Sequence, residues 1–395
     1  MARVVQFSSP RVAEVVDFDP PPLPPGHVRV RTAYSGISAG TELTAYRGTN
    51  PYLTRTWDPD ARIFRDAEAG VSFPVVGWGY SESGEITEVA PDVDGLSVGD
   101  QVWGIWGHRS EAVLPAEKLA GHQLPAGVSL AAASFARVGA IAYNAILSAR
   151  ITLGDLVAIY GQGVIGLLAT RLATLSGAQV LTVDGIESRR QESLKYGALA
   201  AFAPGGAAEQ IRAISTGADA SAAGASGAAA GTAGLRGGSA LLPSSAEGAR
   251  SRGGSPPLLP RAAAGAAGAG GGADTAIELS GVYPALQEAI RSVGVGGRVV
   301  ASGFYQGEGN GLRLGEEFHH NRVELISSQI GGVPPELAGR WSVDRLQRGF
   351  LELVGRGAVD PEPLITHRVG VEDAADAYVL LDTRPGDALQ VVLEF

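Results

Sequence analysis

The spacing of apolar and polar positions divides the chain into two kinds of region. Up to about residue 130, short segments such as 28–33 and 84–89 alternate apolar and polar side chains. A period of two is typical of strands that bury one face. Beyond Leu130, short apolar runs alternate with segments of helical spacing. That alternation predicts a parallel sheet with crossover helices.

The second region can be divided further. Residues 156–160, Leu-Val-Ala-Ile-Tyr, form a continuous apolar run, which predicts a strand buried on both faces. A polar helix is expected to end at Gly197, a residue type that favours helix C-termini. The other predicted elements are helices at 164–176, 188–196 and 283–293, strands at 180–183, 275–279 and 298–301, and two helices with two short strands after 333.

One segment follows neither pattern. Residues 216–272 consist largely of Ala, Gly and Ser, without aromatic residues. Such a composition buries too little apolar surface to offset the entropy of ordering, so we predict a flexible insertion. The fold can tolerate it because the cost of closing a loop grows only logarithmically with length. A loop expansion without a role and a partner-binding or regulatory loop are both consistent with this composition.

The strongest motif is a glycine turn directly after the first fully apolar run. It reads Gly161-Gln162-Gly163-Val164-Ile165-Gly166, and Asp184 ends the following strand. This context is typical of dinucleotide binding. Gly161 allows a tight turn, Gly163 lets backbone N–H groups approach a pyrophosphate, and Gly166 lets helix and strand pack closely.

The residues after this turn predict the cofactor. Asp184 can accept the ribose hydroxyls of NAD and would repel the 2′-phosphate of NADP. We therefore expect NAD in preference to NADP. Arg189, five residues beyond Asp184, either reaches the adenosine end of the cofactor or lies on a solvated helix face.

Composition narrows the classes of function. The chain has 395 residues, a formal net charge of −10 and no Cys, so disulfides, a Cys nucleophile and thiolate-ligated zinc are excluded. An acidic chain without a basic tail argues against nucleic-acid binding. No apolar stretch is long enough to span a membrane, and the N-terminus lacks the apolar run of a signal peptide. We expect a cytoplasmic protein of two domains.

These features together resemble the medium-chain dehydrogenase/reductase superfamily, which is alcohol dehydrogenase-like. The phrase GEITEVAPDVDGLSVGDQVWG at 84–104 adds a specific local likeness. The resemblance implies an α/β fold: a GroES-like substrate domain at 1–135, completed by 333–395, and a Rossmann doubly wound parallel sheet at 136–332 that the insertion interrupts. It also implies a small-molecule substrate and a homodimer or higher homo-oligomer. Further cofactor contacts are implied at Leu279, Ser280, Ser302, Gly303, Phe304, Ser328 and Ile330.

The sequence departs from the zinc-dependent members of this family at the metal. Those members carry a Cys in an early G-I-C loop, a G-H-E motif, and a Cys or Glu before the dinucleotide domain. Ser38, Tyr80 and Arg137 stand at these places, and none is a suitable Zn²⁺ ligand. We therefore predict a zinc-less branch with no metal site. The S-G-I-S-A-G-T-E and G-Y-S-E-S-G stretches have a local likeness to bacteriochlorophyllide dehydrogenase-like members.

Without zinc, another group must stabilise the alkoxide-like charge of hydride transfer. The resemblance directs the loops of Thr41, Glu42 and Tyr80 toward the nicotinamide. Tyr80 is then the expected donor to the substrate oxygen, Thr41 a relay, and Glu42 a base or an orienting group. His108 is a further proton carrier. The structural alternatives are a cleft wall for Tyr80, a turn residue for Thr41 and a backbone acceptor for Glu42.

The expected activity is hydride transfer between a nicotinamide and an alcohol or ketone. Two alternatives remain open from the sequence. One is a zinc-less reductase of activated C=C bonds or quinones. The other is a dinucleotide-binding protein without turnover, because no acid–base set is assured.

Overall fold

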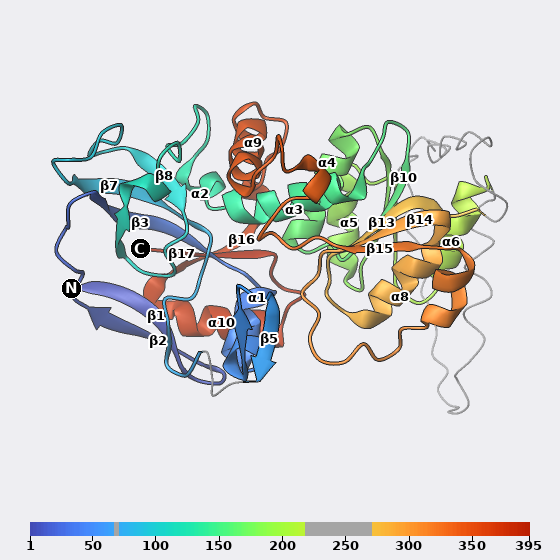
Figure 1. Ribbon diagram of the computed structural model, residues 1–395, viewed down its shortest axis with the longest axis horizontal. Coiled ribbons are helices and arrows are strands. Elements are labelled where there is room, and N and C mark those ends of the chain that lie inside the picture. Colours follow the sequence, from blue (N-terminus) through green and yellow to red (C-terminus); the bar gives the residue numbers. More distant parts are fainter. Residues whose placement is uncertain (67–70, 218–270) are drawn as a thin grey trace, which may run out of the picture.

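The computed structural model describes residues 1–66, 71–217 and 271–395. The insertion predicted at 216–272 lies almost wholly outside these described residues. Two sheet-based regions lie side by side along the longest axis, and both chain ends lie in the same region (Figure 1). Among the described residues, no helix combines the length and apolar character needed to cross a membrane.

One region is built on a six-stranded sheet whose paired strands all run parallel, in the order β12-β11-β10-β13-β14-β15. All five residues of β10 are buried, as its continuous apolar run predicts. The strands are β10 (Leu156–Tyr160), β11 (Gln179–Val183), β12 (Ala200–Phe202), β13 (Ala273–Glu278), β14 (Val293–Ala301) and β15 (Glu324–Ser327). The predicted doubly wound sheet is confirmed.

Helices connect and cover these strands. They are α3 (Ala136–Ala149), α4 (Val164–Leu175), α5 (Glu187–Lys195), α6 (Ala207–Ser215) and α8 (Tyr283–Ser292). The strand order turns back at β10, with β11 on one side and β13 on the other. Open parallel sheets bind ligands at such a switch point, outside the carboxyl ends of the strands.

The other region contains a second six-stranded sheet, in the order β16-β17-β3-β7-β8 with β9 also paired to β3. Its pairs are antiparallel except β16 with β17. The strands are β3 (His27–Ile37), β7 (Glu82–Val89), β8 (Gln101–Gly104), β9 (Glu111–Pro115), β16 (Ile365–Gly370) and β17 (Gln390–Glu394). This β-rich region next to a Rossmann sheet is the architecture expected from the sequence.

Smaller elements complete the structure. A three-stranded sheet and a separate hairpin, which the sequence pattern did not predict, consist of β1 (Ala2–Ser9), β2 (Val12–Phe18) and β6 (Val75–Val76), and of β4 (Arg55–Asp58) and β5 (Ile63–Asp66). The other helices are α1 (Thr41–Arg47), α2 (Leu130–Ala133), α9 (Val343–Gly355) and α10 (Ala374–Thr383). Short helical turns span Pro51–Leu53, Ala116–Lys118, Leu314–Phe318, Pro335–Leu337, Glu362–Leu364 and Val371–Asp373.

The helix α3 lies where the two regions meet (Figure 1) and contacts both β8 and β13. One apolar cluster includes Phe135 before α3, Leu167 of α4 and Phe350 of α9. A Cβ at Gly139 would lie 2.3 Å from the Phe350 ring, so only glycine allows α3 and α9 to approach this closely. Burying a side chain as large as Phe350 contributes about 1.5–3 kcal/mol.

Arg212 of α6 holds the described residues on either side of the insertion. Its guanidinium donates to the carbonyl of Gly271 at 2.9 Å and to that of Val293 at 2.6 Å. The backbone N–H of Gly272 also donates to Ser215 Oγ at 2.6 Å. The two ends of the insertion are therefore adjacent, and each is anchored to the sheet region.

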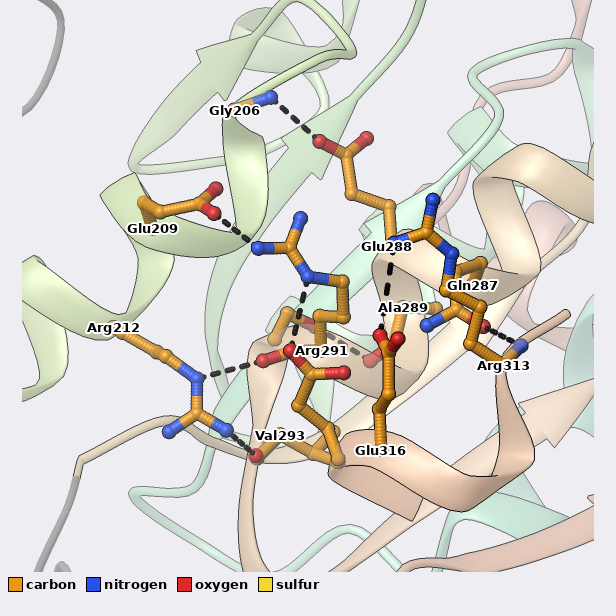
Figure 2. A network of polar contacts seen from close by, with 12 residues as sticks. Gly206, Glu209, Arg212, Gln287, Glu288, Ala289, Arg291, Val293, Arg313 and Glu316 are labelled. Atoms are coloured by element: carbon orange, nitrogen blue, oxygen red, sulfur yellow. Dashed lines mark hydrogen bonds and ion pairs between the residues drawn. The ribbon is translucent and has the colours of Figure 1, made fainter. Parts of the chain in front are cut away.

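A polar network extends these contacts between α6 and α8 (Figure 2). Glu288 Oε1 accepts from the N–H groups of Gly205, Gly206 and Ala207 at 2.8–3.0 Å, which caps the start of α6. Arg291 pairs with Glu209 and, at 3.2 Å, with Glu317. The network fixes α6 against α8.

Candidate active site

The glycine turn between β10 and α4 has the geometry that a pyrophosphate site needs. Gly161 has φ +88°, a left-handed conformation that favours glycine. A Cβ at Gly166 would lie 1.8 Å from the Gly161 carbonyl oxygen, whereas one at Gly163 would meet nothing nearer than Arg189 Nη1 at 3.9 Å. Gly163 is the N-cap of α4, and no side chain caps this helix. The free N–H groups of the first turn therefore suit a phosphate, so this cradle fits a dinucleotide.

Asp184 fixes the turn from the end of β11. Its Oδ2 accepts from the Gln162 N–H at 2.6 Å, and its Oδ1 accepts from the Ile186 N–H at 2.7 Å. Each carboxylate oxygen has a second lone pair, so both can still accept a ribose hydroxyl. Asp184 thus holds the two loops together and keeps its acceptor capacity for a cofactor.

Arg189 does not lie on a solvated helix face, so that alternative is wrong. Its Nη2 donates to the carbonyls of Pro385 and, at 3.2 Å, Ala388. Its Nε is buried without a hydrogen-bond partner among the described residues. Burial lowers the pKa of Arg189, although the charge of Asp184 opposes this effect. Arg189 lies beside the glycine turn and joins α5 to the segment before β17.

The remaining expected cofactor residues follow neighbouring parallel strands. Leu279 and Ser280 come after β13, residues 302–304 after β14, and Ser328 and Ile330 after β15. The carboxyl ends of parallel strands meet at one edge, which is also the edge of the glycine turn. Ser302 Oγ donates to the Ser328 carbonyl at 3.3 Å, which connects two of these loops.

Sequence reasoning missed Glu278, the last residue of β13. Its Oε1 accepts from the Ser280 N–H at 2.7 Å, and its Oε2 accepts from the Gly281 N–H at 3.1 Å and from the Tyr305 hydroxyl. Burial raises the pKa of this carboxyl group. An acid directly after the apolar pair Ala276-Ile277, at the end of the strand, was the available signal. Glu278 shapes the loop that faces Gly161.

The structure brings Tyr80 together with Ser38 and Thr41. The Tyr80 hydroxyl donates to Ser38 Oγ, and the Thr41 side chain lowers the pKa of the phenol. Tyr80 packs against the same apolar cluster as Val164, Ile165 and Leu279. The phenol loop and the cofactor edge are therefore anchored on a common core.

The charges around Tyr80 act in opposite directions. Burial and the charge of Glu42 raise its pKa, whereas the bonds to Ser38 and Thr41 and the charge of Arg137 lower it. The net shift is upward, so the phenol is neutral at neutral pH.

Glu42 and His108 form a pair with exposed fractions of 0%. His108 Nε2 lies 2.7 Å from Glu42 Oε2, and the Tyr378 hydroxyl donates to the same oxygen at 3.1 Å. Glu42 Oε1 accepts from the Ser38 N–H at 2.9 Å. The expected backbone-acceptor role of Glu42 is thus present, and its carboxylate fixes the loop that carries Ser38.

The pair continues into a second buried acid that sequence reasoning did not select. His108 Nδ1 lies 2.6 Å from Ser35 Oγ, and Ser35 donates to Glu82 Oε1 at 3.1 Å. Glu82 Oε2 accepts from the Trp106 N–H at 2.8 Å. With Ser35 donating to Glu82, His108 can donate from Nδ1 to Ser35 and from Nε2 to Glu42, which is the hydrogen-bonding pattern of an imidazolium.

The pKa shifts agree with that assignment. Burial alone would lower the pKa of His108, but the charge and hydrogen bond of Glu42 and the charge of Glu82 raise it overall. Burial raises the pKa of Glu82, and His108 and the amide donors partly oppose this. One buried cation therefore lies between two carboxyl groups.

The three positions that correspond to metal ligands do not fit zinc. Ser38 and Tyr80 are bonded to each other, and the positive charge of Arg137 acts on Tyr80. A guanidinium repels a divalent cation, and neither hydroxyl is a usual Zn²⁺ ligand. Within the described ranges, no group of three or more His, Asp or Glu residues is arranged to hold a metal ion.

A dinucleotide cradle at the switch point of a parallel sheet, next to a β-rich region with a buried polar site, defines an NAD(P)-dependent dehydrogenase. Comparison with known proteins finds sequence similarity along almost the whole chain to curated dehydrogenases, and the same fold in a solved alcohol dehydrogenase-like structure. No protein-family model matches it.

The relatives and solved structures differ in how much of the chain they cover. D-guloside 3-dehydrogenase of Escherichia coli is 25% identical over 98% of this chain and 98% of its own length. A bacteriochlorophyllide A dehydrogenase of Rhodobacter capsulatus is 31% identical but covers 39% of this chain and 46% of its own length. The crystal structure of 2R,3R-butanediol dehydrogenase from Bacillus subtilis covers both chains completely, with a TM-score of 0.70 and 18% identity. This last likeness shows the fold.

Proposed function

We propose that the protein oxidises a secondary hydroxyl of a sugar or polyol, and reduces the corresponding ketone, with NAD and without catalytic zinc. The observation that carries this proposal is the Tyr80 hydroxyl, which is hydrogen-bonded to Ser38 Oγ and lies where a metal ligand would stand in zinc-dependent relatives. One relative that matches along 98% of this chain is a D-guloside 3-dehydrogenase, and its activity supports a sugar-like substrate.

The residues for cofactor binding are those of the glycine turn and its surroundings. The N-terminus of α4 would hold the pyrophosphate, Asp184 the adenosine ribose, and the loops after β13, β14 and β15 the nicotinamide. When bound, NAD accepts the hydride and NADH supplies it. The negative charge of Asp184 is the basis for preferring NAD.

Tyr80 moves the proton in this proposal. During ketone reduction, the carbonyl carbon gains the hydride and the oxygen gains the Tyr80 proton, which leaves an alcohol and a phenolate. Ser38 and Thr41, which lower the pKa of Tyr80, stabilise that phenolate, and water returns the proton afterwards. In the oxidation direction the phenolate takes the proton of the alcohol, and the hydride leaves carbon.

Glu42 and His108 act on the reaction indirectly, without contacting the substrate. Their side chains have no exposed surface, and Glu42 reaches the Tyr80 loop through the Ser38 N–H. We assign them the role of positioning residues that hold residues 38–42 beneath the phenol.

Tyr80→Phe tests the proposal. A general acid contributes a factor on the order of 10²–10⁴ in rate. The kcat for NADH-dependent ketone reduction should therefore decrease by such a factor, while the Kd of NADH stays the same. Tyr143→Phe is the matched control, since Tyr143 packs against the same apolar cluster, and it should keep the parental rate. A kcat of Tyr80→Phe within about threefold of the parent would make Tyr80 a cleft wall.

The substrate panel separates the open alternatives. Oxidised glycosides and polyols are assayed beside enones and quinones, each with NADH. Turnover confined to enones or quinones would identify a C=C or quinone reductase. Binding of NADH without turnover of any member would favour a non-catalytic dinucleotide-binding protein.

A further inference from the structure

We propose that Arg137 is a catalytic residue: its guanidinium stabilises the negative charge that develops on the substrate oxygen, at the place of a metal ion in zinc-dependent relatives. This proposal rests on the function proposed above. It assigns the electrophilic role, which Tyr80 alone does not fill.

The first observation is that Arg137 lacks an anionic partner. It is partly buried in the first turn of α3, and that turn contains no acidic residue. In the part of the chain that the structure describes, its guanidinium makes no hydrogen bond and no ion pair. By contrast, Arg171, a partly buried arginine of the next helix, donates to the Ala358 carbonyl at 2.9 Å. A half-buried cation without an ion pair or hydrogen bond loses hydration that the protein does not replace, so a site that contains such a cation is suited to an anion.

The second observation is the location of this cation. Its neighbours Ala136 and Val138 belong to the same apolar cluster as Trp103 of β8, and Leu279, which follows β13, packs against that cluster. This end of α3 therefore lies between the substrate region and the cofactor edge of the parallel sheet. The charge of Arg137 acts on Tyr80 and lowers the pKa of the phenol, against the larger effect of burial. The interaction is mutual, because Tyr80 also partly offsets the drop that burial causes in the pKa of Arg137. Tyr80 packs against the same apolar cluster as Ala136 and Val138, the residues on either side of Arg137, so the proton donor and the unpaired cation belong to the same part of the site.

Tyr80 and Arg137 have different roles in the proposed reaction. A guanidinium stays protonated in proteins, so Arg137 can donate hydrogen bonds to the oxygen but does not supply the proton. In ketone reduction, carbon gains the hydride, Tyr80 gives its proton to oxygen, and Arg137 remains a cation throughout. Its charge stabilises first the alkoxide-like oxygen and then the Tyr80 phenolate. Donors aimed at a developing oxyanion typically contribute about 10²–10³ in kcat.

Arg137→Met and Arg137→Lys test this assignment in the full chain with NADH and a ketone from the substrate panel. We expect Arg137→Met to lower kcat about 10²–10³-fold and to change KM less than about threefold. The kcat–pH profile should also change. Without the positive charge of Arg137, the pKa of Tyr80 rises, so the part of the profile that reports the titration of Tyr80 moves to higher pH. Arg137→Lys should have a higher kcat than Arg137→Met but a lower one than the parent, because lysine restores the positive charge but not the planar pair of N–H donors of a guanidinium. Free guanidinium should partly rescue Arg137→Ala.

Arg171→Met is the matched control and should keep the parental kcat and pH profile. The Kd of NADH should be unchanged in every variant, which shows that each is folded. Dialysis of the parent against a chelator should leave kcat unchanged. Activity that falls on chelation and returns with Zn²⁺ would overturn the proposal, because a metal would then supply the positive charge.

Two further results would overturn it. One is an unchanged kcat and pH profile in Arg137→Met while Tyr80→Phe is slow, and this would leave the proposed function intact. The other is a raised KM at constant kcat, seen only with carboxylated or phosphorylated substrates, since Arg137 would then bind a remote anionic group. A normal rate in Tyr80→Phe with a slow Arg137→Met would instead refute the Tyr80 mechanism and retain the electrophile.

Discussion

His108→Gln removes the one cation between two buried carboxyl groups and keeps a hydrogen-bond donor of similar reach. His108 and Glu42 are both fully buried, with 2.7 Å between Nε2 and Oε2. Removing one member of a buried pair typically costs 3–5 kcal/mol. Because glutamine still donates one hydrogen bond, we expect a loss near the lower limit, about 3 kcal/mol of unfolding free energy at about pH 6.

The same variant should change how stability depends on pH. The folded-state pKa of His108 lies above its usual value. A group with a raised folded pKa contributes stability that is complete below its unfolded pKa, about 6.5 for His, and that is lost as the pH rises through the folded pKa. Each unit of difference corresponds to about 1.4 kcal/mol. The advantage of the parent over His108→Gln should therefore shrink from about pH 6 toward alkaline pH.

Urea unfolding followed by tryptophan fluorescence measures this difference across that pH series. Trp103 and Trp106 are suitable probes because both are buried in the same region as His108. A difference below about 1 kcal/mol at about pH 6, or one that grows with pH, would refute the assignment of a buried imidazolium.

The other predictions concern the cofactor and the insertion. Asp184→Ser should narrow or reverse the preference for NADH over NADPH in fluorescence titrations, and tighter NADPH binding by the parent would contradict the proposed role of Asp184. Removing residues 218–270 and joining Gly217 to Gly271 should leave NADH binding intact. The unfolding free energy should stay equal or rise by up to about 2 kcal/mol, because each halving of the length of a connection lowers its closure cost by about 0.6 kcal/mol and the deletion corresponds to about three halvings. A melting temperature that falls by many degrees would show that the removed residues pack on the fold.

Local pattern predicted the dinucleotide region well. The run at 156–160 became a fully buried strand, and the helix predicted at 164–176 spans Val164–Leu175. Strands buried on both faces and helices with one apolar face leave clear periodic signals. The glycine turn was equally accessible, because its spacing follows from backbone geometry within six consecutive residues.

The polar site was only partly predictable because it depends on long-range contacts. Glu42 and His108 were selected, but their direct contact across 66 positions was not. Glu82 reads in sequence as part of a polar stretch, and only the pairing of β3 with β7 places it beside Ser35. Tyr378 reaches Glu42 across 336 positions. Such contacts depend on strand pairing and leave no local periodicity.

The position of β17 has a consequence for how the chain folds during synthesis. β3 ends at Ile37, and its neighbour β17 begins at Gln390. The strands of the Rossmann sheet, from Leu156 to Ser327, all leave the ribosome between these two. That sheet can therefore close while β3 still has an open edge, and an open edge favours pairing with other chains. A ribosome that stalls before residue 390 should release a protein with a finished dinucleotide-binding half and an aggregation-prone substrate half.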